Sequence, residues 1–206
     1  IFLNKMDHER ANTGPVIEAI KNKFKKTPIF IHLPQGEKEK FSGIVDLVQN
    51  KFFSYDQEGN GKGKPRDVPA DISDEMEISH AELMEAVAEV DDELIEIYLE
   101  NGELSEEEFS RGFKEGIQEG ELIPVLCGSA LKNIGVDLLL QAVVKYLPSP
   151  ANRVPVIAKK VDDGSEVDRS ANSSETTSAL VFKTVADPYA GKLTLFRTFS
   201  GTIKSD

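Results

Sequence analysis

The chain has 206 residues, of which 39% are hydrophobic and 29% charged, and its net charge is −12 at neutral pH. These values are typical of a globular protein with one large domain or two small ones. The negative charge argues against a broadly basic surface for nucleic acid, although a local patch or a protein contact is enough to bind a ribosome. The sequence has no apolar run of the ~18 residues that span a membrane and no signal peptide, so we expect a cytoplasmic protein with no membrane partner.

The first part of the chain predicts alternating strands and helices. Residues 1–3 are apolar and indicate the end of a strand, and apolar residues recur at the spacing of an amphipathic helix over residues 15–26. Further strands are predicted over residues 29–33, 41–48 and 51–55. The stretch 57–64 is rich in Gly, Asn and Lys and predicts an exposed loop.

The middle of the chain is acidic and predicts three helices. The first covers residues 75–90, and the second is capped by residues 91–92 and ends at 101–102. A capping-box pattern at residues 105–108 begins the third helix, which ends at Gly120. The charged faces of these helices allow either a solvated surface or a protein docking surface.

A buried strand over residues 122–127 and a helix over 136–144 come next, and Pro148 and Pro150 close this helix. The single cysteine, Cys127, excludes an internal disulfide, and its apolar surroundings predict a buried residue rather than a nucleophile.

The composition and the predicted secondary structure of the sequence change after Pro150. Residues 162–178 are polar and predict a loop or linker. Strand-like runs then occupy residues 179–186, 193–199 and 201–204. No helical pattern separates these runs, so they indicate the first strands of a β-domain.

Two short motifs, far apart in the sequence, each follow a predicted strand and precede a predicted helix. They are Asn4-Lys5-Met6-Asp7 and Gly128-Ser129-Ala130. The Asp7 carboxylate can accept from the ring N–H and the exocyclic amine of guanine together, and adenine lacks this pair of donors. Asn4 can hold the loop and reach the base, while the methylene stem of Lys5 can lie on the purine. Such loops lie at the carboxyl ends of strands in open α/β sheets, where ligands bind.

Each motif alone also allows a purely structural role, because Asn and Asp after a strand are ordinary turn residues. Their joint occurrence favours guanine recognition. No phosphate-binding loop of the form GxxxxGK[ST] occurs in the 206 residues. The sequence therefore predicts the base-reading part of a GTPase without its phosphate-binding part, and we expect the chain to be a fragment.

Five ordered motifs resemble those of bacterial elongation factor G or a close elongation-factor-G-like paralogue. They are Phe2-Leu-Asn-Lys-Met-Asp7, Phe41-Ser-Gly-Ile-Val-Asp-Leu47, residues 127–136, Tyr146-Leu-Pro-Ser-Pro150, and the hairpin of residues 187–193 and 197–201. The resemblance covers essentially the whole chain. It implies an α/β fold class: the C-terminal part of a doubly wound P-loop GTPase domain with an α+β inserted subdomain, followed by the start of a translation-factor β-barrel.

The resemblance also implies an order of domains. It assigns residues 1–27 and 119–150 to the GTPase domain and residues 28–118 to the inserted subdomain. Residues 151–174 are expected to be a linker, and residues 175–206 to begin the β-barrel domain II.

The resemblance implies six guanine-site residues, which are Asn4, Lys5, Asp7, Ser129, Ala130 and Leu131. Ala130 is expected to act through its backbone N–H. The parent is expected to bind GTP or GDP, with Mg in the part that this sequence lacks, and to hydrolyse GTP on the ribosome to drive translocation or a related step. In this chain we expect no catalytic residue, no metal ligand, no tightly bound nucleotide and no hydrolysis.

The ribosome is the partner that the resemblance implies, with the stalk protein of the large subunit meeting the inserted subdomain. Sequence-specific contact with nucleic acid is not expected. His8, His32 and His80 lack the sequence context of the family's catalytic histidine, so we expect surface or turn residues at these positions.

Alternatives within and outside this family stay open. Residues 8–12 differ from the usual continuation in the main translocase and fit the paralogue better. A release-factor or ribosomal-protection GTPase is one alternative, although residues 129–136 favour elongation factor G. The other is a free-standing acidic interaction module, whose partner binding is indifferent to guanine nucleotides.

Overall fold

Strand β7 is the middle strand of a three-stranded parallel sheet with the order β1-β7-β2. The strands are β1 (Phe2–Leu3), β2 (Thr27–Phe30) and β7 (Leu122–Cys127). Val125 and Cys127 of β7 are buried, as expected for an apolar strand with neighbours on both sides. The register pairs Leu3 with Cys127. The loops that follow β1 and β7 therefore start side by side at one edge of the sheet.

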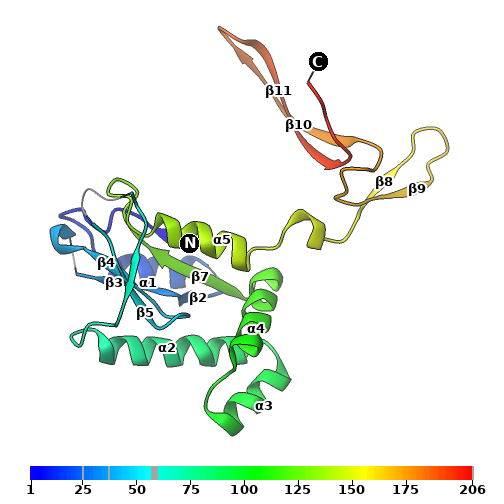
Figure 1. Cartoon of the computed structure of the whole chain (residues 1–206). Coiled ribbons are helices and arrows are strands. Elements are labelled where there is room, and N and C mark those ends of the chain that lie inside the picture. Colours follow the sequence, from blue (N-terminus) through cyan, green and yellow to red (C-terminus); the bar gives the residue numbers. More distant parts are fainter. Residues whose placement is uncertain (25, 37, 57–59, 206) are drawn as a thin grey trace. The chain divides into compact units, whose positions relative to one another are not determined.

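The computed structural model describes residues 1–24, 26–36, 38–56 and 60–205. It divides into two compact units, Ile1–Leu147 and Pro148–Asp206. The first unit combines helices with two sheets, and the second contains β-hairpins (Figure 1). The α/β class predicted for the first part of the chain is therefore confirmed. Within these described ranges, none of the helices has the length and apolar content that crossing a membrane requires.

An antiparallel sheet with the order β3-β4-β5-β6 adjoins the parallel one. Its strands are β3 (His32–Gln35), β4 (Gly43–Asp46), β5 (Lys51–Ser54) and β6 (Lys64–Arg66), and a short 3-10 helix, η1 (Lys38–Lys40), precedes β4. The predicted hairpin of residues 41–48 and 51–55 is confirmed, with shorter strands. Residues 57–59 of the predicted loop lie outside the described residues.

The prediction of one strand over residues 29–33 is wrong, because the chain changes sheets at Ile31. The Ile31 N–H donates to the carbonyl of Val125 in the parallel sheet, with an N–O distance of 3.1 Å. The Ile31 carbonyl accepts from the N–H of Leu47, just after β4, at 3.0 Å. One buried residue therefore links the two sheets.

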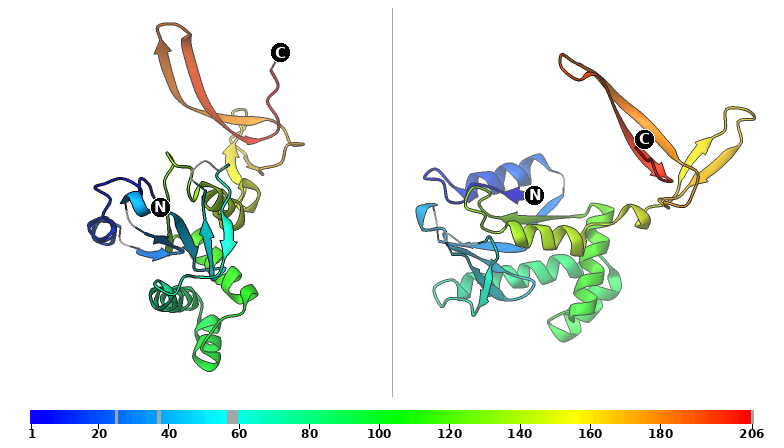
Figure 2. Two further views of the ribbon diagram at one scale, coloured as in Figure 1. Left: turned by 60° about the vertical axis from the view of Figure 1, so that its left-hand side comes forward. Right: turned by 45° about the horizontal axis from the view of Figure 1, so that its top comes forward.

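Five α-helices lie in the described part of the first unit. They are α1 (Thr13–Lys23), α2 (Ser73–Ala88), α3 (Asp92–Asn101), α4 (Glu106–Glu119) and α5 (Val136–Tyr146). All five were predicted, with shifted ends. Figure 1 shows α2 and α5 on opposite sides of the strands, and Figure 2 shows α2, α3 and α4 gathered as one helical group.

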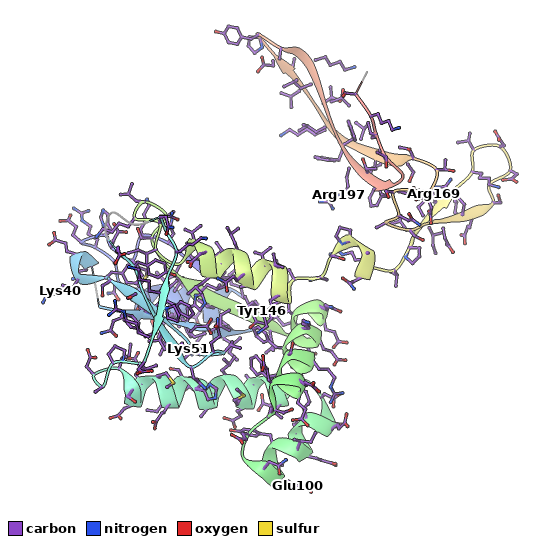
Figure 3. The ribbon with its side chains drawn as sticks, in the orientation of Figure 1. Lys40, Lys51, Glu100, Tyr146, Arg169 and Arg197 are labelled. Carbon is purple, nitrogen blue, oxygen red and sulfur yellow. The ribbon has the colours of Figure 1, made fainter. Side chains whose placement is uncertain are left out.

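The helices and both sheets share a buried core. Phe113 of α4 is fully buried, and its ring meets the Tyr146 ring of α5 edge to face, with 4.7 Å between centroids. Figure 3 labels Tyr146 at the end of α5. Leu83 of α2 and Leu94 of α3 belong to the same cluster as Leu126 of β7. The acidic helices are therefore anchored to the parallel sheet by apolar side chains.

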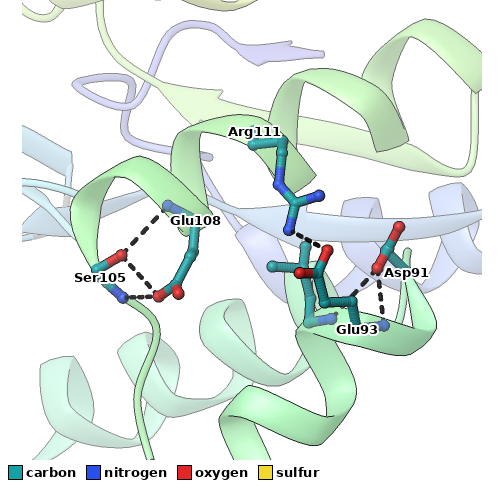
Figure 4. Close-up of polar contacts among 6 residues, drawn as sticks. Asp91, Glu93, Ser105, Glu108 and Arg111 are labelled. Carbon is teal, nitrogen blue, oxygen red and sulfur yellow. Dashed lines mark hydrogen bonds and ion pairs between the residues drawn. The ribbon is translucent and has the colours of Figure 1, made fainter.

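The predicted caps of α3 and α4 are confirmed (Figure 4). The Asp91 carboxylate accepts the backbone N–H of Glu93 at 2.8 Å. The Ser105 hydroxyl accepts the N–H of Glu108 at 3.4 Å, and the Glu108 carboxylate accepts the N–H of Ser105 at 2.8 Å. Arg111 of α4 also binds Glu93 at 3.0 Å, which ties the two helices together.

The second unit departs from the sequence prediction at two places. It contains η2 (Pro150–Asn152), β8 (Val156–Lys159), β9 (Glu166–Arg169), β10 (Ser178–Asp187) and β11 (Gly191–Ser200). The hairpin β8–β9 occupies a stretch predicted to be a linker or loop. The prediction missed β9 because its residues are mostly polar and show no apolar strand pattern. Residues 201–204 form no strand, because β11 ends at Ser200 and the next residue, Gly201, has a φ of +73°. The predicted strands over 179–186 and 193–199 are confirmed as β10 and β11.

The expectation of a surface or turn position is wrong for His32. This residue lies in β3 and only 2% of it is exposed, because β3 also contacts β7 of the parallel sheet and residues of α5 lie beside His32. His80 is half-buried, with its Nδ1 at 2.8 Å from the Leu47 carbonyl oxygen, and His8 is exposed as expected. Among the described residues, the His32 Nδ1 has no hydrogen-bond partner, and His32 lines a cavity of about 40 Å³.

His32 makes the stability of the first unit sensitive to acid. Burial lowers the pKa of His32 to about 4, and the charges of Asp46 and Asp137 oppose this shift only in part. The unfolded chain protonates the imidazole below its ordinary pKa of 6.5, so the free energy of unfolding decreases as the pH falls between these two values. The decrease amounts to roughly 3 kcal/mol once the pH lies below both.

Substituting His32→Gln should remove this part of the pH dependence. Urea unfolding at a series of values between about pH 7 and pH 4 measures it. The matched control is His8→Gln, at an exposed histidine, which should keep the wild-type slope. Equal acid sensitivity of the two variants would contradict the assignment to His32.

Candidate functional site

The first candidate loop, residues 4–7, leaves the end of β1. Met6 is buried, and its N–H donates to the carbonyl of Gly128 at 3.2 Å. Lys5 is exposed and has a φ of +64°, a left-handed conformation that is uncommon for a residue with a Cβ. Asp7 is half-buried. The loop is thus pinned at Met6 to the end of β7, and its polar residues lie on either side of this anchor.

The second candidate loop, residues 128–135, joins β7 to α5 and is closed by a β-bridge between Ser129 and Ile134. The backbone groups of these two residues exchange two hydrogen bonds of 2.9 Å. Ser129 is fully buried, and its hydroxyl oxygen accepts the N–H of Lys132 at 3.1 Å. The Ser129 side chain therefore maintains the shape of the loop, and it does not face solvent.

Asn4 joins the two loops. Its Oδ1 accepts the N–H of Ala130 at 2.9 Å and the N–H of Lys5 at 2.8 Å. The structure thus brings Asn4 and Ala130 together, and the Ala130 N–H that we expected to face a base is donated to Asn4. Within the part of the chain that is described, neither the amide nitrogen of Asn4 nor the N–H of Leu131 has an acceptor, and the Asp7 carboxylate has no donor. These groups are available to a ligand.

Two glycines that the sequence analysis gave no separate role allow the second loop to close on itself and to pack against Phe2 and Ile44. A Cβ on Gly128 would overlap the carbonyl oxygen of Ile134 and lie 2.7 Å from the ring of Phe2. Gly135 has a φ of +77°, and a Cβ there would overlap the side chain of Ile44. The sequence does hold a signal for Gly135, which is its position directly before a predicted helix.

A cleft of about 440 Å³ lies beside the first loop, but of the available polar groups it includes only those of Asn4. Phe2, Leu3 and residues 4–6 line it together with the start of α1, while Asp7, Ala130 and Leu131 do not. The sheet order makes β1 an outer strand, and the cleft lies along this strand. We therefore place the candidate site at the Asn4–Ala130 junction and not in this cleft.

Other chemistry at this edge is limited by burial. Burial raises the pKa of the Cys127 thiol to about 12, and only 1% of the residue is exposed, so the prediction of an inert buried cysteine is confirmed. Across the described residues, no group of three or more His, Cys, Asp or Glu side chains is placed to hold a metal ion.

A family model described as "Elongation factor Tu GTP binding domain" matches residues 1–149. The chain belongs to this family. The resemblance to elongation factor G is also confirmed, because the chain is 40% identical over 203 residues to elongation factor G of Thermotoga sp. (strain RQ2) and 39% identical over 203 residues to that of Thermotoga maritima.

These relatives are much longer than the chain. Each match covers 98% of this chain and 29% of the relative. A crystal structure of a protein from Thermus thermophilus matches with a TM-score of 0.74 and 27% identity, over 97% of this chain and 27% of that one. The chain therefore spans less than a third of the length of each of these three proteins.

Substituting Asn4→Ala should decrease the free energy of unfolding by about 1 kcal/mol, because the N–H groups of Ala130 and Lys5 lose their acceptor. Asn4→Asp keeps an acceptor and should retain most of the stability. Asn12→Ala is the matched control, because the Asn12 side chain makes no capping hydrogen bond at α1. Urea unfolding measures all three, and an equal effect of the two alanine substitutions would argue against the junction.

Proposed function

We propose that this chain supplies guanine-base recognition to a ribosome-dependent translational GTPase of the elongation factor G type. The observation that carries the proposal is the hydrogen bond from the Ala130 N–H to Asn4 Oδ1, which joins the two motif loops at one edge of the parallel sheet. Ligands of open α/β sheets bind at this edge, beyond the carboxyl ends of the strands. The family membership and the similarity to elongation factor G support the same proposal.

Each available group has a counterpart on guanine. The Asp7 carboxylate accepts from the ring N–H and the exocyclic amine, and the Asn4 amide nitrogen donates to N7. The base oxygen O6 accepts from the loop tip, where the Leu131 N–H has no acceptor among the described residues and the Ala130 N–H is shared with Asn4. The Lys5 stem lies on the purine face. Ser129 supports the shape of the loop tip, because its hydroxyl oxygen accepts the N–H of Lys132.

The residues of this chain fit the base and not the phosphates. The 206 residues contain no GxxxxGK[ST] loop, and the groups that hold the phosphates and Mg in a GTPase are expected elsewhere in the parent. We therefore propose that GTP or GDP binds the intact factor, and that this chain alone binds nucleotide weakly and does not hydrolyse it.

The domain arrangement is part of the proposal. Residues 1–27 and 119–150 form the end of the GTPase domain, and residues 175–206 begin a β-barrel. The inserted subdomain is better drawn from His32 than from residue 28, because β2 pairs with β7 in the parallel sheet. The pairing of β10 with β11 is consistent with the first hairpin of a barrel.

The proposed partner is the ribosome, reached in the cytoplasm, with the stalk protein of the large subunit docking on the inserted subdomain. The outward carboxylates of α2, α3 and α4 suit a basic partner surface. Translocase and elongation-factor-G-like paralogue remain separate proposals, for which residues 8–12 favour the paralogue. A free-standing acidic module is the alternative outside the family, and it predicts partner binding that ignores guanine nucleotides.

Substituting Asp7→Asn in the intact factor should weaken GDP binding by about a hundredfold, because the carboxylate that pairs with both donors is lost. It should improve binding of xanthosine diphosphate, whose C2 carbonyl can accept from the new amide. Equilibrium titration with both nucleotides measures the switch.

Glu9→Gln is the matched control, because Glu9 is an exposed carboxylate two residues from Asp7. It should leave both affinities unchanged. An unaltered preference for GDP in Asp7→Asn would exclude Asp7 as the base reader. Indifference of all variants to nucleotide would favour the acidic interaction module.

A further inference from the structure

Tyr55, which follows β5, and Gly63, which precedes β6 in the β5–β6 hairpin, are fastened to the end of the second candidate loop. The Asp137 carboxylate, in the first turn of α5, accepts the Tyr55 hydroxyl at 2.7 Å and the Gly63 N–H at 2.9 Å. Both donors belong to this hairpin, and Asp137 follows Gly135 by only two residues. The hairpin therefore holds the point at which the loop becomes a helix.

Tyr55 is suited to a fixed donor role. It is half-buried, and burial together with its hydrogen bond to Asp137 raises the pKa of its hydroxyl well above the ordinary value. The hydroxyl consequently stays protonated near neutral pH and donates to the carboxylate. Gly63 lies against the Tyr55 ring, where a Cβ would come within 2.9 Å of ring atoms, so the two donors form one packed unit.

Two further contacts reach the loop itself. The backbone at Gly61 lies so close to the Asn133 side chain that a Cβ there would overlap it. Ile44 of β4 is fully buried and packs on Gly135. Residues 128–135 are thus held by Asn4 on one flank and by the antiparallel sheet on the other.

We propose that the β5–β6 hairpin positions the second loop for the guanine base, with Tyr55 and Asp137 as positioning residues. This inference rests on the proposed function, since it names the part of the fold that holds the same guanine site in place. The loop tip at Ala130 and Leu131 can donate to O6 only while the loop keeps its shape. Loosening the hairpin should therefore weaken the contact with O6 and spare the contact between Asp7 and the exocyclic amine.

The test is Tyr55→Phe in the intact factor, with dissociation constants for GDP and inosine diphosphate. Phenylalanine keeps the ring against Gly63 and removes the donor to Asp137. Inosine diphosphate carries O6 and the ring N–H but lacks the exocyclic amine. Both dissociation constants should therefore increase by the same factor, up to about tenfold, which is the effect of losing one ordinary hydrogen bond, here the bond to O6.

Tyr146→Phe is the matched control. Tyr146 is a buried tyrosine of the same unit, and its hydroxyl makes no hydrogen bond to any described residue. Its substitution should leave both dissociation constants unchanged, and thermal unfolding of both variants shows whether loss of stability alone explains an effect. If Tyr55→Phe does not fold, Asp137→Asn serves instead, because it keeps one acceptor and should give a smaller parallel increase.

The outcomes separate the two proposals. Failure of the wild-type factor to bind GDP would overturn the proposed function itself. Normal GDP binding with Tyr55→Phe equal to Tyr146→Phe would overturn only the positioning role. A selective loss for GDP over inosine diphosphate would also overturn it, because the hairpin would then act on the reading of the amine.

Discussion

The pairing of β1 with β7 is the interaction on which the candidate site depends. The two strands are more than a hundred residues apart in the sequence, yet the parallel register places Leu3 beside Cys127. The Gly128 N–H continues the ladder by donating to the Leu3 carbonyl at 3.0 Å. A slip of one residue would turn the strand faces over and separate Asn4 from Ala130. The chemistry of both motifs is useful only because this register is fixed.

The antiparallel sheet is a structural part of the same unit and does not form a core of its own. Ile44 and Phe53 of that sheet belong to one buried cluster with Val125 and Cys127 of β7. Ile31 bonds to both sheets through its backbone. The acidic helices extend this core through leucine and phenylalanine side chains. The antiparallel sheet and the acidic helices therefore share their buried contacts with β7, the strand that precedes the second candidate loop.

The sequence revealed features that depend on local chemistry. The capping pattern at Ser105 was visible because spacing and residue type are sufficient signals, and the same signals singled out the two candidate loop motifs. The change of sheet at Ile31 was not visible, because a continuous apolar run does not indicate which strand each of its residues pairs with. Burial of His32 likewise depends on distant elements. The sequence paired the two motifs, but it did not show that the Asn4 side chain accepts the Ala130 N–H, a bond that spans 126 residues.

Lys5 shows how the first loop balances two demands. A residue with a Cβ at a φ of +64° is generally less stable than glycine there by roughly 1 kcal/mol. Glycine would relieve the strain but would lose the methylene stem that we assign to the purine face. Thermostability and ligand recognition therefore favour different residues at this position. A stability-based redesign of the chain would choose glycine at residue 5 and would, in doing so, remove part of the site.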